Sequence, residues 1–134
     1  MKLETVATND EELRVMLESG LVLREAGRLD EAETIFQGIR ELVPQSNVPL
    51  VALSSIAARR GDFEAALRLC EEALRHEPSS LFARVNRAEI LLYQKRRGEA
   101  ETELREIIEI APESPHSRTA QSLLNVAQMI PETA

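Results

Sequence analysis

The sequence is poor in cysteine and in aromatic residues. Its 134 residues include one cysteine, no tryptophan and only 3% aromatic residues. A single cysteine cannot form an internal disulfide, which excludes a small domain held together by disulfides. The common residues are alanine, leucine, isoleucine, glutamate and arginine, and this composition is typical of packed helices rather than of a sandwich or barrel. We therefore predict an all-α protein.

Basic residues are outnumbered, and long apolar runs are missing. The 23 acidic residues exceed the 16 lysines and arginines, which gives a formal net charge of −7. Binding to nucleic acid or to an anionic membrane needs a concentrated positive surface, so neither partner is expected. No apolar run approaches the roughly 20 residues that span a bilayer, and the first residues lack the apolar core of a secretory signal. These features predict a cytoplasmic protein with no membrane insertion.

What the sequence does contain is a repeat. In residues 60–78 a glycine turn is followed by an amphipathic run with small alanines and then by a closing proline. The same order of residues occurs before and after this stretch, and two sets of equivalent positions recur every 34 residues. We call such a set a column; the two columns are Ala32, Ala66 and Ala100, and Pro44, Pro78 and Pro112. A period of 34 residues is typical of arrays of helix-turn-helix units.

The period places the repeats at residues 13–46, 47–80 and 81–114, within a single domain over 10–134. Amphipathic spacing predicts helices over 10–26, 30–42, 47–60, 62–76 and 98–110. A further helix is predicted between them, capped by Ser79 or Ser80 and ending at about Tyr93 or Lys95. Ser114 and Pro115 fit a helix cap followed by proline in the first turn. We expect a capping helix over 115–131, because the last repeat of an array needs a cover for its open side. Residues 1–9 are predicted to be a flexible lead-in.

These columns resemble the tetratricopeptide repeat (TPR) family, whose unit is a pair of antiparallel helices. That family has a small residue at position 8, alanine at position 20, a large apolar residue at position 24 and proline at position 32. Here position 8 reads Gly20, Ser54 and Ala88, and position 24 reads Phe36, Cys70 and Leu104. Small residues allow two helices to approach closely. The resemblance implies three repeats and a capping helix stacked in a right-handed α-solenoid.

The third repeat departs from the family pattern. Arg84 and Arg87 stand at positions 4 and 7, where the family usually buries apolar side chains. An unpaired buried arginine would cost several kcal/mol. We therefore expect the first helix of this repeat to be rotated or exposed at an edge.

The resemblance also implies a binding surface, because the first helices of stacked TPR repeats line a concave face. The residues predicted to bind a partner there are Leu17, Leu21, Val48, Val51, Ser55, Phe82, Val85, Glu89, Leu92 and Leu123. The same row of positions includes Arg24, His116 and Thr119. Most of the row is apolar, and an uncovered apolar strip usually serves as a binding site or an oligomer contact.

One known TPR role is not expected. Co-chaperones that bind the acidic C-termini of heat-shock proteins carry a clamp of Lys, Asn and Arg, whereas this chain has Leu17, Leu21, Ala52, Phe82 and Asn86 at those places. Its size, charge and groove resemble instead the TPR chaperones of bacterial type III secretion, which hold a hydrophobic helix or an extended segment of a secreted subunit. We predict a non-enzymatic module or chaperone for a protein or peptide client. The alternative is a structural scaffold that self-associates through TPR surfaces into a polymer. A monomer or a homodimer would instead fit the client-binding module.

The residues that could carry other chemistry are better explained by structure. Cys70 falls on the inward column, where a thiol behaves as a small hydrophobe, and His76 and His116 have no neighbours at metal-ligand spacing. No cofactor is expected.

Two groups of charged residues remain. The first is predicted to form a solvated face of one helix: Glu99, Glu101, Glu103, Glu106 and Glu109. The second falls at the turns inside each repeat: Arg24, Arg28, Arg59, Arg60, Lys95, Arg96 and Arg97. These cations would stabilise helix C-termini or form a docking edge for an acidic partner.

Overall fold

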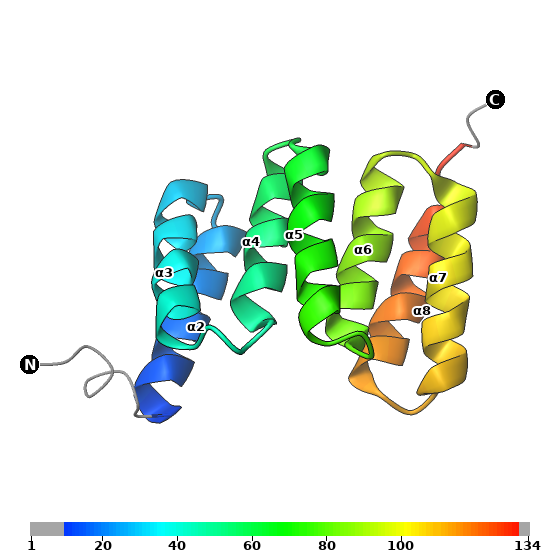
Figure 1. Ribbon diagram of the computed structural model, residues 1–134. Coiled ribbons are helices and arrows are strands. Elements are labelled where there is room, and N and C mark those ends of the chain that lie inside the picture. The colour runs from blue at the N-terminus through cyan, green and yellow to red at the C-terminus, as the bar shows by residue number, and fades with distance from the viewer. Residues whose placement is uncertain (1–9, 132–134) are drawn as a thin grey trace, which may run out of the picture.

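The computed structural model describes residues 10–131, and over this range the chain forms seven α-helices and no strand. The helices are α2 (Asp10–Glu25), α3 (Leu29–Leu42), α4 (Val48–Arg59), α5 (Phe63–His76), α6 (Leu81–Tyr93), α7 (Arg97–Ile110) and α8 (Pro115–Ala127). The helix pairs follow one another along an elongated array, from α2 and α3 at one end to α7 and α8 at the other (Figure 1). The predicted all-α solenoid is confirmed. The predicted lead-in at 1–9 lies outside the described residues.

Consecutive helices pair and the pairs stack. α2 packs on α3, α4 on α5 and α6 on α7, while α3 also contacts α4 and α5 also contacts α6. In addition, the first helices α4 and α6 pack against each other, and α6 packs against the capping helix α8. Each pair therefore buries its apolar faces against the next, which a single helical hairpin could not do alone.

The small-residue columns lie where helices approach most closely. Ala32, Ala66 and Ala100 are fully buried. At Gly20 an added Cβ would stand 2.7 Å from Cζ of Phe36, so the phenylalanine ring occupies the space that any larger residue would need. In the third repeat the corresponding residues, Ala88 and Leu104, belong to one buried cluster. A larger side chain at position 24 thus accompanies a smaller one at position 8.

Caps and turns set most helix ends. The side chains of Asp62, Ser80 and Ser114 each accept a hydrogen bond from a backbone N–H in the first turn of α5, α6 and α8. Gly27 and Gly61 have positive φ in the first two intra-repeat turns, and Lys95 takes that conformation in the third. The helix predicted to start at Gly98 begins one residue earlier, at Arg97. The last helix ends at Ala127, before the predicted boundary at 131, and Pro131 follows shortly.

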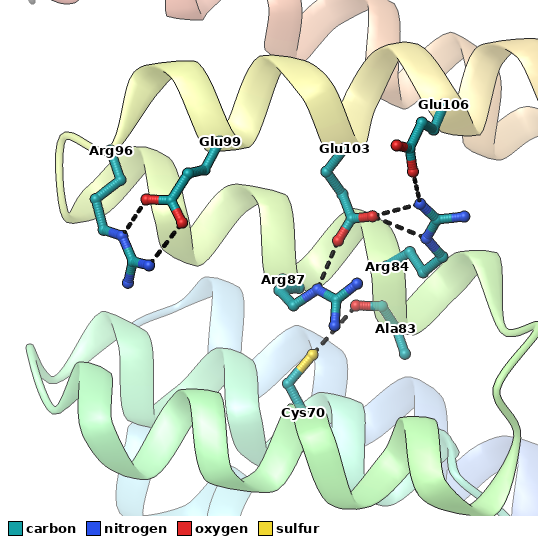
Figure 2. Close-up of polar contacts among 8 residues, drawn as sticks. All are labelled: Cys70, Ala83, Arg84, Arg87, Arg96, Glu99, Glu103 and Glu106. Carbon is teal, nitrogen blue, oxygen red and sulfur yellow. Dashed lines mark hydrogen bonds and ion pairs between the residues drawn. The ribbon is translucent and has the colours of Figure 1, made fainter.

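Repeat three corrects two expectations. Its first helix, α6, is neither rotated out nor confined to an edge, since Ala83, Ala88 and Ile90 are fully buried. Arg84 and Arg87 instead donate to one carboxylate, that of Glu103, which is 8% exposed (Figure 2). Glu103 therefore does not belong to a solvated face. The sequence reasoning missed this pairing because it treated the arginines and the glutamates as separate groups.

The turn arginines mostly pair with acidic side chains of the same molecule. Arg28 pairs with Glu31 and Arg96 with Glu99, each three residues away. Arg97 pairs with Glu101 and also donates to the carbonyl of Ile130, at the end of the capping segment. These contacts favour a structural role for the arginines over a free docking edge.

In residues 10–131 no helix has the length and apolarity to cross a membrane.

The two boundaries between repeats are built differently. At the first boundary, between α2–α3 and α4–α5, four arginines reach across: Arg24 to Ser55, Arg40 to Glu72, Arg59 to Glu25, and Arg60 to Asp30 and Glu33. At the second boundary, between α4–α5 and α6–α7, buried hydrogen bonds link the repeats. Asn86 donates to Ser54 Oγ at 2.8 Å, Ser54 donates to the carbonyl of Ala66, and the thiol of Cys70 lies 3.2 Å from the carbonyl of Ala83.

Candidate protein-binding groove

A cavity of about 480 Å³ opens on the side of the array formed by the first helices of the repeats. Residues of α2, α4, α6 and the capping helix α8 all contribute to its wall. They are Arg24, Glu25, Val51, Ser55, Arg59, Phe82, Val85, Asn86, Glu89, Pro115, His116 and Thr119. We call this cavity the groove. It exists because four successive first helices share one face of the solenoid.

The structure brings half of the predicted binding residues together in the groove, namely Val51, Ser55, Phe82, Val85 and Glu89. The others lie elsewhere. Leu17 packs against the buried cluster around Phe36. Leu92 of α6 and Leu123 of α8 belong to apolar clusters in which α8 packs against the third repeat. Val48 is half-buried at the start of α4, and Leu21 is exposed on α2 outside the groove wall.

Several groove residues were not predicted: Glu25, Arg59, Asn86 and Pro115. Glu25 and Arg59 each lie one helical turn after a residue of the predicted row, Leu21 and Ser55. Because residues four apart share a helix face, counting one turn onward from Leu21 in α2 and from Ser55 in α4 would have identified them.

One part of the groove is apolar. Val51 forms its floor with only 1% exposure, whereas Phe82 is 39% exposed and offers its ring to an incoming group. The ring of Phe82 lies near that of His116 on α8, with 6.5 Å between ring centroids. Val85 follows Phe82 by three residues on the same face of α6. This part can receive an apolar side chain.

The other part of the groove is charged. Arg59 donates to the carboxylate of Glu25 at 2.5 Å, and Nε of Arg24 lies 3.7 Å from the same carboxylate. Arg24 also donates to Ser55 Oγ at 3.3 Å, but its Nε is buried without a hydrogen bond. Two arginines therefore share Glu25, and the fourth charge of the groove is Glu89.

Glu89 is the least satisfied of these charged groups. Within residues 10–131 it makes no hydrogen bond and no ion pair, although it is partly buried. Burial raises the pKa of Glu89, the nearby Glu25 adds to this, and Arg59 and Arg24 oppose it. The groove thus contains a carboxylate that lacks a donor.

A second cavity, of about 360 Å³, lies between α5, α6 and α7. Three of its four carboxylates, Glu99, Glu103 and Glu106, are held by Arg96, Arg87 and Arg84, as Figure 2 shows, and the fourth, Glu71, is exposed to solvent. Burial alone would raise the pKa of Glu103, but the hydrogen bonds from Arg87 and Arg84 outweigh it, and the pKa lies below its usual value. This cavity therefore offers satisfied ion pairs, unlike the groove.

The remaining chemistry is structural. Burial raises the pKa of the Cys70 thiol to about 11, so it stays protonated and unreactive near neutral pH. Across residues 10–131 no group of three or more His, Cys, Asp or Glu side chains could hold a metal ion.

Comparison with known families decides the kind of array. A family model described as tetratricopeptide repeat matches residues 57–124, and a second model of the same description matches residues 14–46. The chain belongs to the TPR family. Among curated proteins, it is 30% identical over 94 residues to anaphase-promoting complex subunit 3 of Schizosaccharomyces pombe. The match covers 70% of this chain and only 14% of that protein, so this TPR chain spans a small part of the relative's length.

Solved structures share the same fold at low identity. The chaperone PcrH from Pseudomonas aeruginosa superposes with a TM-score of 0.70 and 19% identity, covering 90% of this chain and 94% of that one. The type III secretion chaperone SycD of Yersinia enterocolitica, in complex with a peptide of the translocator YopD, superposes with a TM-score of 0.67 and 17% identity. The match covers 91% of this chain and 96% of that one. The first TPR domain of human RPAP3 superposes with a TM-score of 0.70 and 21% identity, and the match covers 87% of this chain and 89% of that one. These likenesses show a TPR fold.

Proposed function

We propose that this TPR protein binds a segment of a client protein in the groove and has no catalytic role. The observation that carries the proposal is a cavity walled by four helices that combines an exposed phenylalanine, Phe82, with an unpartnered carboxylate, Glu89. Structures of similar fold support it, because SycD is seen with a YopD peptide and PcrH with the chaperone-binding region of PopD.

The chemistry of the groove favours an apolar client over an acidic tail. The first TPR domain of Spaghetti (RPAP3) is seen with the HSP90 peptide SRMEEVD, and the TPR2B domain of yeast Sti1 is seen in a complex with pHsp70. In this chain the two groove arginines, Arg24 and Arg59, are held by Glu25, and Glu89 would repel a carboxylate. A chaperone for an apolar segment, as in type III secretion, is therefore the more specific form of the proposal. A cytoplasmic location stays a prediction.

Selection from a random peptide display library tests the proposal. Peptides enriched on the wild-type protein should lose at least about ten-fold in affinity for Phe82→Asp, because a charge replaces the exposed apolar wall. Ile110→Asp is the matched control, since Ile110 is 61% exposed and lies outside the groove. Val51 is unsuitable because it is buried, and an aspartate there would disturb the fold.

The proposal fails if no peptide is enriched, or if the enriched peptides bind Phe82→Asp as well as they bind wild type. Circular dichroism of each variant shows whether weaker binding results from a change in the groove or from unfolding of the protein. Titration of synthetic peptides by calorimetry gives the affinities directly.

One observation favours the alternative of self-association. Val15 and Val22 are seven residues apart on one face of α2, at the end of the array, and they are 52% and 66% exposed. If this face joins copies of the chain, light scattering will give a mass that rises with concentration and returns to the monomer value in Val15→Glu/Val22→Glu. A monomer at all concentrations would exclude the scaffold.

A further inference from the structure

We propose that the groove is specific for a client segment anchored by an aromatic residue that carries a hydrogen-bond donor, tyrosine or tryptophan. The ring would lie against Val51, Val85 and Phe82, and its O–H or N–H would donate to the carboxylate of Glu89. This inference rests on the proposed function and specifies the partner of the same site.

The apolar wall and the acceptor share one helix face. Phe82, Val85 and Glu89 are spaced at i, i+3 and i+7 along α6, so all three point into the groove. From Val85 to Glu89 the helix rises by about 6 Å, one turn and a little more. An aromatic ring that packs on Val85 and on Val51 of α4 therefore has its far edge near Glu89.

An occupant that covers Glu89 must also satisfy it. The carboxylate has no hydrogen bond or ion pair within residues 10–131, and it relies on solvent for donors. A wholly apolar client would remove that solvent and leave a buried charge without a partner, which is costly. Leucine or phenylalanine at this place is therefore disfavoured relative to a residue with a donor at its tip.

The donor should be uncharged. Arg24 and Arg59 lie close enough to Glu89 to oppose the rise in its pKa that burial causes. Both arginines already share the carboxylate of Glu25. The four charges of the groove balance, so a lysine or arginine from the client would add a positive charge beside two guanidinium groups. A carboxylate would meet Glu25 and Glu89. Tyrosine and tryptophan combine an apolar body with a neutral donor, and both are common anchors of protein interfaces.

Peptide display followed by a double-mutant cycle tests this inference. Peptides enriched on the wild-type protein should carry a common tyrosine or tryptophan. For a tyrosine peptide, Tyr→Phe should weaken binding about ten-fold on wild type, the usual effect of losing a hydrogen bond to a charged group. On Glu89→Leu the same peptide pair should bind equally. Glu89→Gln, which keeps an acceptor oxygen of the same shape, should retain part of the preference for tyrosine.

The outcomes separate this inference from the proposed function. If enriched peptides are lost on Phe82→Asp but carry lysine, arginine, leucine or phenylalanine at the common position, the groove binds clients and the inference is wrong. It is equally wrong if Glu89→Leu and Glu89→Gln both keep the full tyrosine preference. If no peptide depends on Phe82, the proposed function itself fails.

Discussion

Apolar side chains are buried at both boundaries between repeats, but the polar contacts there differ. Between the first and second repeats they are mainly arginine–carboxylate pairs near solvent, whereas between the second and third repeats they are buried hydrogen bonds of hydroxyl, amide and thiol groups. Arg59 and Arg60 reach from α4 to Glu25 and Asp30 at the first boundary. Ser54 and Asn86 meet at the second, both nearly inaccessible to solvent.

This difference shows that one repeat template permits two ways of joining neighbours. Exposed ion pairs contribute roughly 0–1 kcal/mol each and weaken in salt. A buried hydrogen bond contributes little net, but removing one partner leaves the other unsatisfied at a cost of about 1–3 kcal/mol. The two boundaries should therefore respond differently to mutation and to salt.

The largest effect is expected at Glu103, which ties the two helices of the third repeat together. Glu103→Ala removes the carboxylate that Arg84 and Arg87 share, while Arg84 keeps Glu106. Breaking a buried pair from one side costs several kcal/mol, so we expect a loss of about 3 kcal/mol in urea unfolding.

Glu31→Ala is the control from the first repeat, because Glu31 makes an exposed pair with Arg28. It should change stability little. Equal effects of the two substitutions would contradict the distinction between buried and exposed pairing.

The next effect concerns close packing in the first repeat. Gly20→Ala places a Cβ against the buried ring of Phe36, and overpacking of this kind costs about 2 kcal/mol. Phe36→Leu in the same chain should relieve the clash, because the third repeat already combines alanine with leucine at these positions, Ala88 and Leu104. Thermal unfolding of the two single variants and the double variant measures the coupling, and strictly additive losses would refute it.

A smaller loss is expected from Ser54→Ala at the second boundary. Asn86 would keep its buried amide without the Ser54 acceptor, which should cost about 1–2 kcal/mol in chemical unfolding. Ser55→Ala is a matched control one residue away, since Ser55 meets only a long contact from Arg24 near solvent. Adding Asn86→Leu to Ser54→Ala should recover part of the loss. If Ser55→Ala proves the more harmful substitution, the buried network is not what joins the repeats.

Salt should distinguish the two boundaries without any mutation. Raising the salt concentration to about 1 M reduces the Debye length to about 3 Å and screens the arginine pairs of the first boundary. Hydrogen exchange should then accelerate in α2 and α3 more than in α6 and α7, by an amount equivalent to at most about 1 kcal/mol. Uniform acceleration along the chain would contradict the comparison.

The smallest effect is a pH dependence at Glu89. Because its pKa is raised in the folded state, Glu89 lowers stability as pH rises from the usual value of about 4.3 through the raised value. Glu103 acts in the opposite direction, since its lowered pKa stabilises the fold above the usual value and that contribution is lost as pH falls through the folded pKa. Glu89→Gln should therefore be slightly more stable than wild type at pH 7, with a difference that vanishes near pH 3.

The fold could be predicted from the sequence because its determinants repeat. Alanine and proline at a fixed period of 34 residues place three helix pairs, and Ser114 with Pro115 marks the capping helix. Arg84 and Arg87 led to a wrong expectation, because their partner Glu103 lies on the next helix and the repeat pattern does not say which charges meet. Pairing between helices depends on side-chain geometry that periodicity does not encode.

The groove was predicted only in part for a similar reason. Val51, Phe82 and Val85 stand at positions that face the concave side in any TPR array, so the resemblance placed them. Leu92 and Leu123 occupy similar positions, but α8 packs close enough to bury Leu92, and Leu123, which is part of α8, is itself half-buried. Glu25 and Arg59 were missed because the four positions taken from the family end one residue short of them.

The most direct test of the groove as a binding site is a chemical-shift map of the protein titrated with a display-selected peptide. We expect the perturbed amides to cluster on α4 and α6 around Val51, Val85 and Glu89 and on the start of α8, with α3 and α7 little changed. Perturbations centred on α5 and α7, around the second cavity, would contradict it.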